Sequence, residues 1–309
     1  MSVVGFVGLG AMGGPIAGRL LAAGHEVHGT NRTPSKAGPL IQRGLIWHKT
    51  PREVAAAADV VFSMVSNDAA LEAIAGGPDG ILAGLGPDNI YVDMSTVSPA
   101  AGVALAARVR ALGARMLDAP VSGSVPVAEA GTLTIMVGGE ESALRQVEPL
   151  LDELGQSVTH VGDNGQGLLL KLAINVSLAA QILAFSEGLL LAERGGIDSQ
   201  LAVRVMSESA IGSPAVKARV PMMLDLPEHA WFDVGMMRKD IGLALDAGHG
   251  ERVPLPSAAA ASDILAKAGE LGYDGRDIAA LREVLARLAD RLVPSAWAPS
   301  EVRPQREAS

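Results

Sequence analysis

The sequence predicts an α/β domain with a doubly wound, mainly parallel sheet, followed by an all-α domain, with a long helix joining the two. Three observations predict this architecture. A glycine-rich turn stands between a short apolar strand and a helix at the start of the chain. Further strand-like and helix-like segments then alternate. Beyond them, a long apolar stretch without proline leads into segments whose patterns are helical.

The composition supports two folded domains and narrows the classes of function. The chain has 309 residues, of which 49% are hydrophobic and 19% charged, so it can bury a sizeable core. Its 25 basic and 34 acidic residues give a formal net charge of −9, which argues against a general binder of nucleic acid or of anionic membranes. Cysteine is absent, which excludes disulfides, thiolate chemistry and cysteine-ligated metals. Because the first residues lack the basic start of a signal peptide, we expect a soluble cytoplasmic protein.

The N-terminal turn predicts dinucleotide binding. Residues 3–7 have the pattern of a buried strand, residues 16–23 have helical spacing, and a second strand follows. Between strand and helix, Gly8 permits a tight turn, Gly10 lets the backbone approach a pyrophosphate, and Gly13 allows close helix packing. The start of the helix then offers free N–H groups to the phosphates. This is the Rossmann pattern, and its predicted cofactor residues are Gly8, Leu9, Gly10, Ala11, Met12 and Gly13.

The end of the second strand, predicted at residues 25–31, indicates which nicotinamide cofactor is bound. An acidic side chain there hydrogen-bonds the ribose 2′-hydroxyl and repels a 2′-phosphate. This chain carries Asn31, Arg32 and Thr33 instead, with no carboxylate. A guanidinium clamps a phosphate with two parallel hydrogen bonds, and the amide and hydroxyl can add others. We therefore predict NADP in preference to NAD, with NAD as the second choice; the alternative is that Arg32 is only a solvated charge.

The alternation of strands and helices continues to residue 154. Strands are predicted at residues 59–65, 89–94, 115–118 and 132–137, and helices at residues 69–74, 99–112 and 140–154. In a doubly wound sheet, ligands bind beyond the carboxyl ends of the strands. We therefore expect the chemistry in the loops that leave those ends, at residues 66–67, 95–97 and 120–124.

Residues 168–194 predict one helix roughly 40 Å long, because each helical residue adds about 1.5 Å. Lys171 and Asn175 are four residues apart and share one face of it. Three interpretations compete for this helix. A membrane span suits its length, but polar and charged residues recur along it and are costly in hydrocarbon. The others are a buried helix whose lysine extends to solvent, and an amine and an amide presented together into a cleft.

Four stretches occur in an order and spacing that is highly specific as a set. They are VGLGAMGGP at residues 7–15, DAPVSGS at 118–124, GQGLLLKLAIN at 165–175 and KDIGLA at 239–244. Together they resemble the β-hydroxyacid dehydrogenase family, which includes 3-hydroxyisobutyrate dehydrogenase and the glyoxylate/succinic semialdehyde reductases. The resemblance covers residues 3–292.

The resemblance implies reversible hydride transfer between a nicotinamide cofactor and a β-hydroxyacid or short aldehyde acid. We place a Rossmann domain at residues 1–162, an all-helical domain at 163–297 and a polar tail at 298–309. In the family the helical domain supplies much of an oligomer interface. The expected partners are therefore a small-molecule substrate with a carboxylate and a second copy of the chain, in a homodimer or homotetramer, with no nucleic acid and no membrane.

The resemblance gives Lys171 the role of general acid/base. Its ammonium would donate a proton to the carbonyl oxygen as hydride reaches the carbon, and the neutral amine would accept that proton in oxidation. Burial beside Leu170 and Leu172 is expected to lower its pKa toward the working pH. Asn175, one turn further on, is expected to hydrogen-bond the same oxygen.

The resemblance places the substrate carboxylate at Ser122 and Gly123, where a hydroxyl and backbone N–H groups can hold it. The family commonly has a second glycine where this chain has Ser124. That departure also occurs in the glyoxylate/succinic semialdehyde reductase branch, as does an Asn-Arg-Thr segment, which favours reduction of aldehyde acids with NADPH. The alternative for this segment is a tight turn without a ligand.

Two further positions match family residues near the nicotinamide and the substrate carboxylate, Thr96 and Lys239. Asp240 either orients Lys239 or makes a structural ion pair, and we favour the structural role. The resemblance also implies three residues that line the cofactor groove: Val65, Ser66 and Asn67.

The C-terminal part is helical in pattern, with helices predicted at residues 256–268 and 275–292. Trp231 and Phe232 either line the substrate cleft or anchor the core. The six histidines show no metal-ligand spacing, so we predict no metal. Two other functions stay open. An imine reductase would have similar cofactor motifs, but usually an aspartate or tyrosine in place of Lys171. The other is a catalytically idle nucleotide-binding protein.

Overall fold

The computed structural model describes residues 2–292, and their contacts divide the chain into two compact units. The first unit extends from the N-terminus to Ala179 and includes Gly235–Ser262. The second comprises Ala180–Val234 and the chain from Asp263 onward. We predicted a boundary after residue 162, in front of the long helix. By contacts, the first half of that helix is grouped with the first unit, because its first turn, with Leu168, is part of that unit's core; the predicted domain boundary stays a prediction.

The first unit contains the doubly wound sheet that the sequence predicts. Its parallel strands lie in the order β3-β2-β1-β4-β5-β6, so the chain extends the sheet in both directions from β1. The order reverses between β1 and β4, which is where such a sheet binds its ligand. The strands are β1 (Val3–Val7), β2 (Glu26–Thr30), β3 (Ile46–Trp47), β4 (Val60–Ser63), β5 (Ile90–Asp93) and β6 (Arg115–Asp118).

Three more strands extend the sheet beyond β6. β8 (Leu133–Gly139) runs antiparallel to β6 and to the short β7 (Val121–Ser122), and β9 (Gly155–Gly162) runs parallel to β8. The sequence predicted β8 but not β9. Several side chains of β9 are polar and exposed, so the strand has no apolar run and forms through its pairing with β8.

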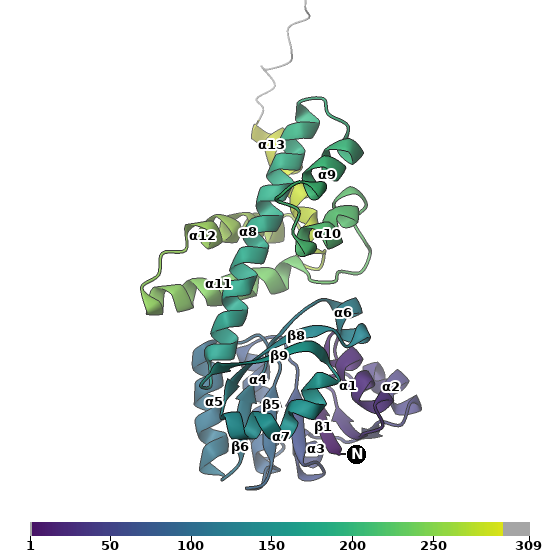
Figure 1. Ribbon diagram of the computed structural model, residues 1–309, viewed down its shortest axis with the longest axis vertical. Helices are drawn as coiled ribbons and strands as arrows, with labels where there is room; N and C mark the ends of the chain where they lie inside the picture. The colour runs from purple at the N-terminus through teal and green to yellow at the C-terminus, as the bar shows by residue number, and fades with distance from the viewer. Residues whose placement is uncertain (1, 293–309) are drawn as a thin grey trace, which may run out of the picture. The chain divides into compact units, whose positions relative to one another are not determined.

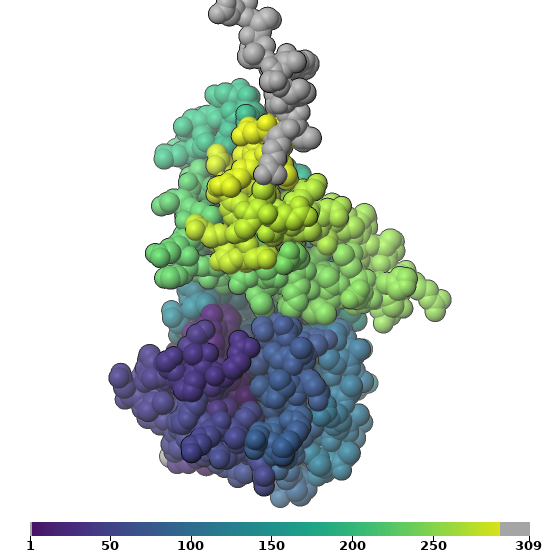
Figure 2. Space-filling view, turned by 180° about the vertical axis from the view of Figure 1, so that it is seen from behind, coloured from purple at the N-terminus to yellow at the C-terminus, as the bar shows by residue number. Residues whose placement is uncertain are grey.

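Helices cover both faces of this sheet (Figure 1). Val4 and Phe6 of β1 belong to one buried core, whereas Val7 belongs to the other. In Figure 2, the N-terminal strands and helices, coloured purple to blue, form a continuous packed body. The α-helices are α1 (Gly13–Ala22), α2 (Gly38–Gln42), α3 (Pro51–Ala56), α4 (Asp68–Ala75), α5 (Pro99–Ala111), α6 (Val125–Ala130) and α7 (Glu141–Asp152), with 3-10 turns η1 (Pro34–Ala37) and η2 (Ile81–Ala83).

Side-chain caps set the start of several helices. The Thr50 hydroxyl accepts the Glu53 N–H at 3.2 Å, and the Glu53 carboxylate accepts the Thr50 N–H at 3.4 Å, which makes a capping box at α3. At α4 the Asn67 side chain accepts the Ala70 N–H at 2.8 Å, and at α5 the Ser98 hydroxyl accepts the Ala101 N–H at 3.1 Å. The last two caps follow β4 and β5, so they fix the first helical turns beside the carboxyl edge of the sheet.

The long helix is α8 (Gln166–Arg194), close to its predicted bounds. By length and composition alone it is apolar enough to cross a membrane, and 39% of its most apolar window is buried inside the protein. The core helix of a soluble protein passes the same test. Its first half belongs to the first unit and buries both Lys171 and Asn175 there, which fits a helix within a folded core.

The helices predicted for the C-terminal part are present and are divided between the units: nearly all of α11 (Val234–Glu251) and the start of α12 (Pro256–Glu270) belong to the first unit, and the others belong to the second. Glu193 of α8 pairs with Arg282 at 2.6 Å, and buried Asp277 accepts the backbone N–H groups of Trp231 and Phe232 at 2.9 and 3.1 Å. The cleft role predicted for these aromatics stays a prediction. The other helices after α8 are α9 (Ser199–Glu208), α10 (Pro214–Leu224), η3 (Ile278–Ala280) and α13 (Leu281–Leu292). The predicted polar tail at 298–309 lies outside the described residues.

Candidate active site

The loops expected to carry the chemistry leave neighbouring strands of the first unit. β1, β4, β5 and β6 are adjacent and parallel, so their carboxyl ends meet at one edge of the sheet. The glycine-rich turn leaves β1, residues 66–67 follow β4, residues 95–97 follow β5, and residues 120–124 follow β6. Sequence-distant segments are therefore neighbours at this edge.

The glycine-rich turn has the shape that a pyrophosphate requires. Gly8 has a φ of +99°, and a Cβ there would lie 2.3 Å from the Met64 carbonyl oxygen. A Cβ on Gly13 would lie 2.0 Å from the Gly8 carbonyl oxygen, so both glycines are required by close packing. Around Gly10, by contrast, nothing lies within 4 Å of such a Cβ. That open space is where the turn can admit the phosphates of a dinucleotide.

Asn31 holds this turn from the end of β2. Its Oδ1 accepts the Leu9 N–H at 3.1 Å, and its Nδ2 donates to the Thr33 carbonyl oxygen at 3.0 Å. We predicted that Asn31 adds hydrogen bonds to a phosphate. The structure uses Oδ1 and one N–H of its amide to bind the glycine-rich turn to the segment that carries Arg32, and its contact with a phosphate stays a prediction. The Arg32 and Thr33 side chains are exposed and are free to meet a ligand there.

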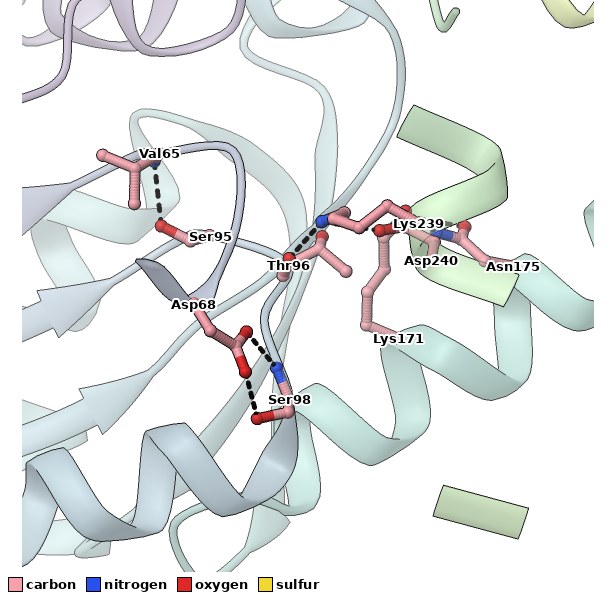
Figure 3. A network of polar contacts seen from close by, with 9 residues as sticks. All are labelled: Val65, Asp68, Ser95, Thr96, Ser98, Lys171, Asn175, Lys239 and Asp240. Carbon is pink, nitrogen blue, oxygen red and sulfur yellow. Dashed lines mark hydrogen bonds and ion pairs between the residues drawn. The ribbon is translucent and has the colours of Figure 1, made fainter. Parts of the chain in front are cut away.

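The loops after β4 and β5 are joined by a buried polar network. Asp93 is fully buried, and its Oδ1 accepts hydrogen bonds from the hydroxyls of Ser63 and Ser95 at 2.6 and 2.7 Å. The Ser95 hydroxyl in turn accepts the Val65 N–H at 2.9 Å (Figure 3). Burial raises the pKa of Asp93 to about 6, against the opposing hydrogen bonds from Ser63 and Ser95. The network fixes Val65 of the predicted cofactor groove relative to Thr96.

Replacement of Asp93 by asparagine should change how stability depends on pH. The pKa of this carboxyl is about 6 in the folded chain and 3.8 in the unfolded chain. Its protonated form therefore stabilises the fold fully at a pH below 3.8, and this contribution is lost as the pH rises through about 6. The wild type should therefore lose roughly 2 kcal/mol relative to Asp93→Asn between pH 4 and pH 8. Urea unfolding of both proteins at several pH values in this range gives their free energies of unfolding. In the difference between the two proteins, the contributions of the other titrating groups cancel. Parallel stability curves would contradict the shift.

The loop after β6 presents the residues predicted to hold a carboxylate. Ser122 pairs with Thr134 of β8, which fixes the start of the loop. Gly123 has a φ of +145° and a Cβ there would lie 2.7 Å from Leu133 and Val127, so glycine is required. Ser124 is the residue before α6 and gives it no side-chain cap. Gly123 is exposed, so its backbone can meet an anion.

Lys171 and Asn175 begin a chain of contacts inside the first unit. The Lys171 ammonium donates to Asn175 Oδ1 at 3.0 Å, and Asn175 Nδ2 donates to Asp240 Oδ2 at 2.7 Å. Lys171 is 9% exposed, while Asn175 is fully buried. Of the two leucines expected to bury the lysine, Leu172 is buried, but Leu170 is 41% exposed. The predicted pairing of the amine and the amide on one helix face is therefore present.

Lys239 of α11 completes this chain (Figure 3). Its ammonium lies 2.8 Å from Asp240 Oδ1 and donates a hydrogen bond to the Thr96 carbonyl oxygen. The contact with Oδ1 is an ion pair without the angles of a hydrogen bond. Asp240, for which we favoured a purely structural role, is buried with one oxygen toward Asn175 and the other toward Lys239. It therefore joins α8 to α11 at the site itself.

The electrostatics of this group suit an anionic ligand. Burial raises the pKa of Asp240, while Lys239 and then Lys171 oppose that rise. With both amines protonated and Asp240 ionised, the three groups carry a formal charge of +1. A buried excess of positive charge is stabilised by an anion such as a carboxylate.

Some residues of the site were missed by the sequence reasoning. Ser63 and Asp93 tie β4 to β5, and Asp118 accepts backbone N–H groups at the start of α8. Each of these polar residues is the last residue of its strand and follows buried hydrophobic residues, and that position is the signal that could have identified them. Among residues 2–292 there is no group of three or more histidine or acidic residues placed to hold a metal ion.

Two domain matches now define the class of protein. Residues 3–162 match the NAD binding domain of 6-phosphogluconate dehydrogenase, and residues 165–285 match the NAD-binding region of NADP-dependent 3-hydroxyisobutyrate dehydrogenase. Together with the open glycine-rich turn and the buried amine, they define the chain as an oxidoreductase that uses a nicotinamide cofactor.

Similar proteins narrow the class to a family. The chain is 33% identical to glyoxylate/succinic semialdehyde reductase 2 of Arabidopsis thaliana, over 93% of this chain and 80% of the relative. It is 34% identical to 2-hydroxy-3-oxopropionate reductase of Escherichia coli, over 93% and 98%. The solved 3-hydroxyisobutyrate dehydrogenase of Mycobacterium tuberculosis with L-serine is 32% identical, with a TM-score of 0.81, over 92% and 99%. The chain belongs to the β-hydroxyacid dehydrogenase family.

An imine reductase is a more distant neighbour. The solved enzyme from a Pseudomonas species is 24% identical, with a TM-score of 0.61, over 92% of this chain and 99% of the other. This likeness is one of fold alone. The relatives with higher identity are reductases and dehydrogenases of hydroxyacids, so they favour this chemistry over reduction of imines.

Proposed function

We propose that this protein reversibly reduces a short aldehyde acid to the hydroxyacid with NADPH, and that Lys171 is its general acid/base. The observation that carries the proposal is the buried chain from Lys171 through Asn175 and Asp240 to Lys239, which ends at the Thr96 carbonyl oxygen. It puts a proton donor and a second cation in the unit that has the dinucleotide turn.

Lys171 is the group that moves the proton. In reduction its ammonium donates to the carbonyl oxygen, and in oxidation the neutral amine accepts the hydroxyl proton. Asn175 holds the ammonium through Oδ1 and is itself held by Asp240, so the amine is kept in one orientation. An asparagine amide has two N–H groups. The one that does not bond Asp240 can donate to the substrate oxygen, as predicted from the sequence.

The substrate carboxylate is held away from the reacting carbon in this proposal. The Ser122 hydroxyl and the Gly123 N–H lie on the loop after β6, and Lys239 supplies a cation. Aldehyde acids such as succinic semialdehyde and glyoxylate carry a carboxylate at one end and a carbonyl at the other. A site with an anion-binding loop and a separate proton donor fits both groups of such a molecule.

The residues present fit a nicotinamide dinucleotide, and NADP in particular. When bound, the cofactor supplies the hydride in reduction and receives it in oxidation. Gly8, Gly10 and Gly13 would hold its pyrophosphate. The hydrogen bond from the Val65 N–H to the Ser95 hydroxyl would hold Val65 and Thr96, the residue after Ser95, in place at the nicotinamide end. The segment after β2 has an exposed Arg32 and no acidic residue between 29 and 33, which favours a 2′-phosphate over a free 2′-hydroxyl.

We also propose that the chain forms a homodimer or homotetramer through its helical part and acts in the cytoplasm. The second unit exposes several large apolar side chains, among them Leu191, Val205 and Ile211. Single exposed apolar residues are ordinary, but several of them in one unit can be buried when two copies of the chain associate. Light scattering coupled to size exclusion measures the state, and a monomer at micromolar concentration would refute this proposal.

The substrate class is tested by absorbance at the reduced-nicotinamide band. Succinic semialdehyde, glyoxylate, 3-hydroxyisobutyrate and a cyclic imine are each offered with both cofactors, and kcat/KM is measured for each. We expect oxidation of NADPH by an aldehyde acid, with a kcat/KM on the order of tenfold or more above that with NADH. Turnover of the imine alone, or of none of the four, would refute the proposed function.

A further inference from the structure

A buried carboxylate joins the loop after β6 to the helix that carries Lys171. Asp118, the last residue of β6, is fully buried. Its Oδ1 accepts the Gly165 N–H at 2.8 Å, and its Oδ2 accepts the Leu168 N–H at 3.1 Å. The Asn164 side-chain amide adds a third hydrogen bond to Oδ1 at 3.3 Å. Both oxygens of this side chain are therefore used on the first turn of α8.

The first turn of α8 provides a reason for an acidic residue at this place. The first N–H groups of a helix have no partner within it, and the aligned peptide dipoles make that end positive. α8 is 29 residues long, and Asp118 comes from a strand that lies 47 residues before Gly165 in the chain. A carboxylate supplied from the sheet therefore satisfies the helix terminus and fixes it to the end of β6.

The surroundings of Asp118 leave its carboxylate one position. A Cβ on Gly138 would lie 2.7 Å from Asp118 Oδ2, and one on Gly167 would lie 2.8 Å from the same atom. Two glycines are therefore needed to let the carboxylate lie between β8 and the first turn of α8. Such close packing allows neither β6 nor the start of α8 to shift without breaking these contacts.

We infer that Asp118 is a positioning residue that fixes how far the substrate-carboxylate loop lies from the Lys171 ammonium, and so selects the length of the substrate. This inference rests on the proposed function. Ser122 follows Asp118 by four residues and is held to Thr134 of β8. Lys171 follows Leu168 by three residues on the same helix. One side chain thus connects the two groups that would hold opposite ends of an aldehyde acid.

The consequence is a prediction about selectivity. With the hydrogen bonds between Asp118 and the first turn of α8 intact, an aldehyde acid of the right length can reach both the carboxylate-binding loop and the Lys171 ammonium, and a shorter or longer one cannot. When these hydrogen bonds are lost, kcat/KM for the favoured substrate should fall steeply, whereas kcat/KM for a substrate of the wrong length should change little. Succinic semialdehyde and glyoxylate differ in the number of carbons between carboxylate and carbonyl, so the ratio of their kcat/KM values reports the fixed distance.

Asp118→Asn tests the inference, because the amide keeps the volume and one acceptor but turns its NH2 group toward one of the two backbone N–H donors. We expect kcat/KM for the favoured acid to fall on the order of 10- to 100-fold, since small misplacements of reacting groups have effects of that size. The ratio between the two acids should move toward one by about fivefold or more, while the Kd for NADPH stays within about twofold. Asn164→Ala removes the third hydrogen bond to Asp118, together with the hydrogen bonds that Asn164 donates to the Met116 and Gly138 carbonyl oxygens, and leaves both backbone N–H donors on the carboxylate. It should move the ratio the same way by less, and it carries the test if Asp118→Asn does not fold.

Val147→Ala is the matched control. Val147 is fully buried on α7 in the same unit, and α7 carries none of the residues proposed to bind substrate or cofactor. Its truncation lowers stability, so activity toward both acids should fall together and their ratio should stay as in the wild type. A ratio that is unchanged or larger in Asp118→Asn would overturn the inference. A wild type that reduces neither acid would refute the proposed function, and the inference with it.

Discussion

Lys171→Ala should lower kcat for the favoured aldehyde acid by about 10² to 10⁴, the range that a positioned acid or base contributes. The amine is nearly buried and is held by Asn175, so no neighbouring group can take its place without rearrangement. The Kd for NADPH should stay within about twofold, because the dinucleotide turn is formed by other segments. Steady-state kinetics and cofactor titration of the same preparation measure both quantities.

Two further variants separate proton transfer from charge at this position. Lys171→Arg keeps a cation that can attract the substrate, but a guanidinium stays protonated in proteins and cannot release its proton readily. It should therefore lose kcat nearly as much as the alanine variant does. Lys267→Ala removes an exposed lysine of α12 and should leave kcat unchanged. If either Lys171 variant kept kcat within about threefold of the wild type, the general acid/base assignment would be wrong.

Arg32→Ala should reduce affinity for NADPH on the order of 10- to 100-fold and leave affinity for NADH unchanged. A charge-assisted hydrogen bond to a phosphate contributes about 1.5–3 kcal/mol, and a guanidinium can make two of them. Asn31 already holds the segment through Leu9 and Thr33, so the backbone should not collapse when the arginine side chain is removed. Isothermal titration with both cofactors measures the two affinities.

Arg145→Ala is the control for loss of one positive charge from the same unit. Arg145 is exposed on α7 and pairs with Glu141 at 3.0 Å. This variant should bind both cofactors as the wild type does, because a surface charge far from the phosphate is screened by salt. Equal losses of NADPH and NADH affinity in Arg32→Ala would show that the arginine supports the fold of the segment and does not recognise a 2′-phosphate.

Local patterns predicted those parts of the site that lie within one element. The turn with Gly8, Gly10 and Gly13 combines a strand, three spaced glycines and a helix, and each part constrains its neighbours. The pair Lys171 and Asn175 follows from helical periodicity alone. The doubly wound sheet was predictable for a related reason, since short apolar runs that alternate with helical segments leave few topologies.

Contacts between distant elements could not be predicted in this way. Asn175 and Asp240 are 65 residues apart, and no local pattern in either segment shows that they meet; only the family resemblance placed the neighbouring Lys239 near the site. The sequence favoured a structural ion pair for Asp240, and the pair with Lys239 is present, but its second contact, with the Asn175 amide, is one that local patterns do not show. Asn31 shows the same limit: its type suits a phosphate ligand, but its position beside the Leu9 N–H gives its amide a partner within the protein.

The central claim is hydride transfer to the carbonyl carbon of an aldehyde acid, and following a deuterium label tests it most directly. Succinic semialdehyde is incubated with NADPH that carries deuterium at the transferable position of the nicotinamide, and the hydroxyacid product is examined by mass spectrometry and NMR. We expect a single deuterium on the carbinol carbon in the wild type and almost no product with Lys171→Ala. A hydroxyacid without deuterium, or full product formation by the alanine variant, would contradict the account.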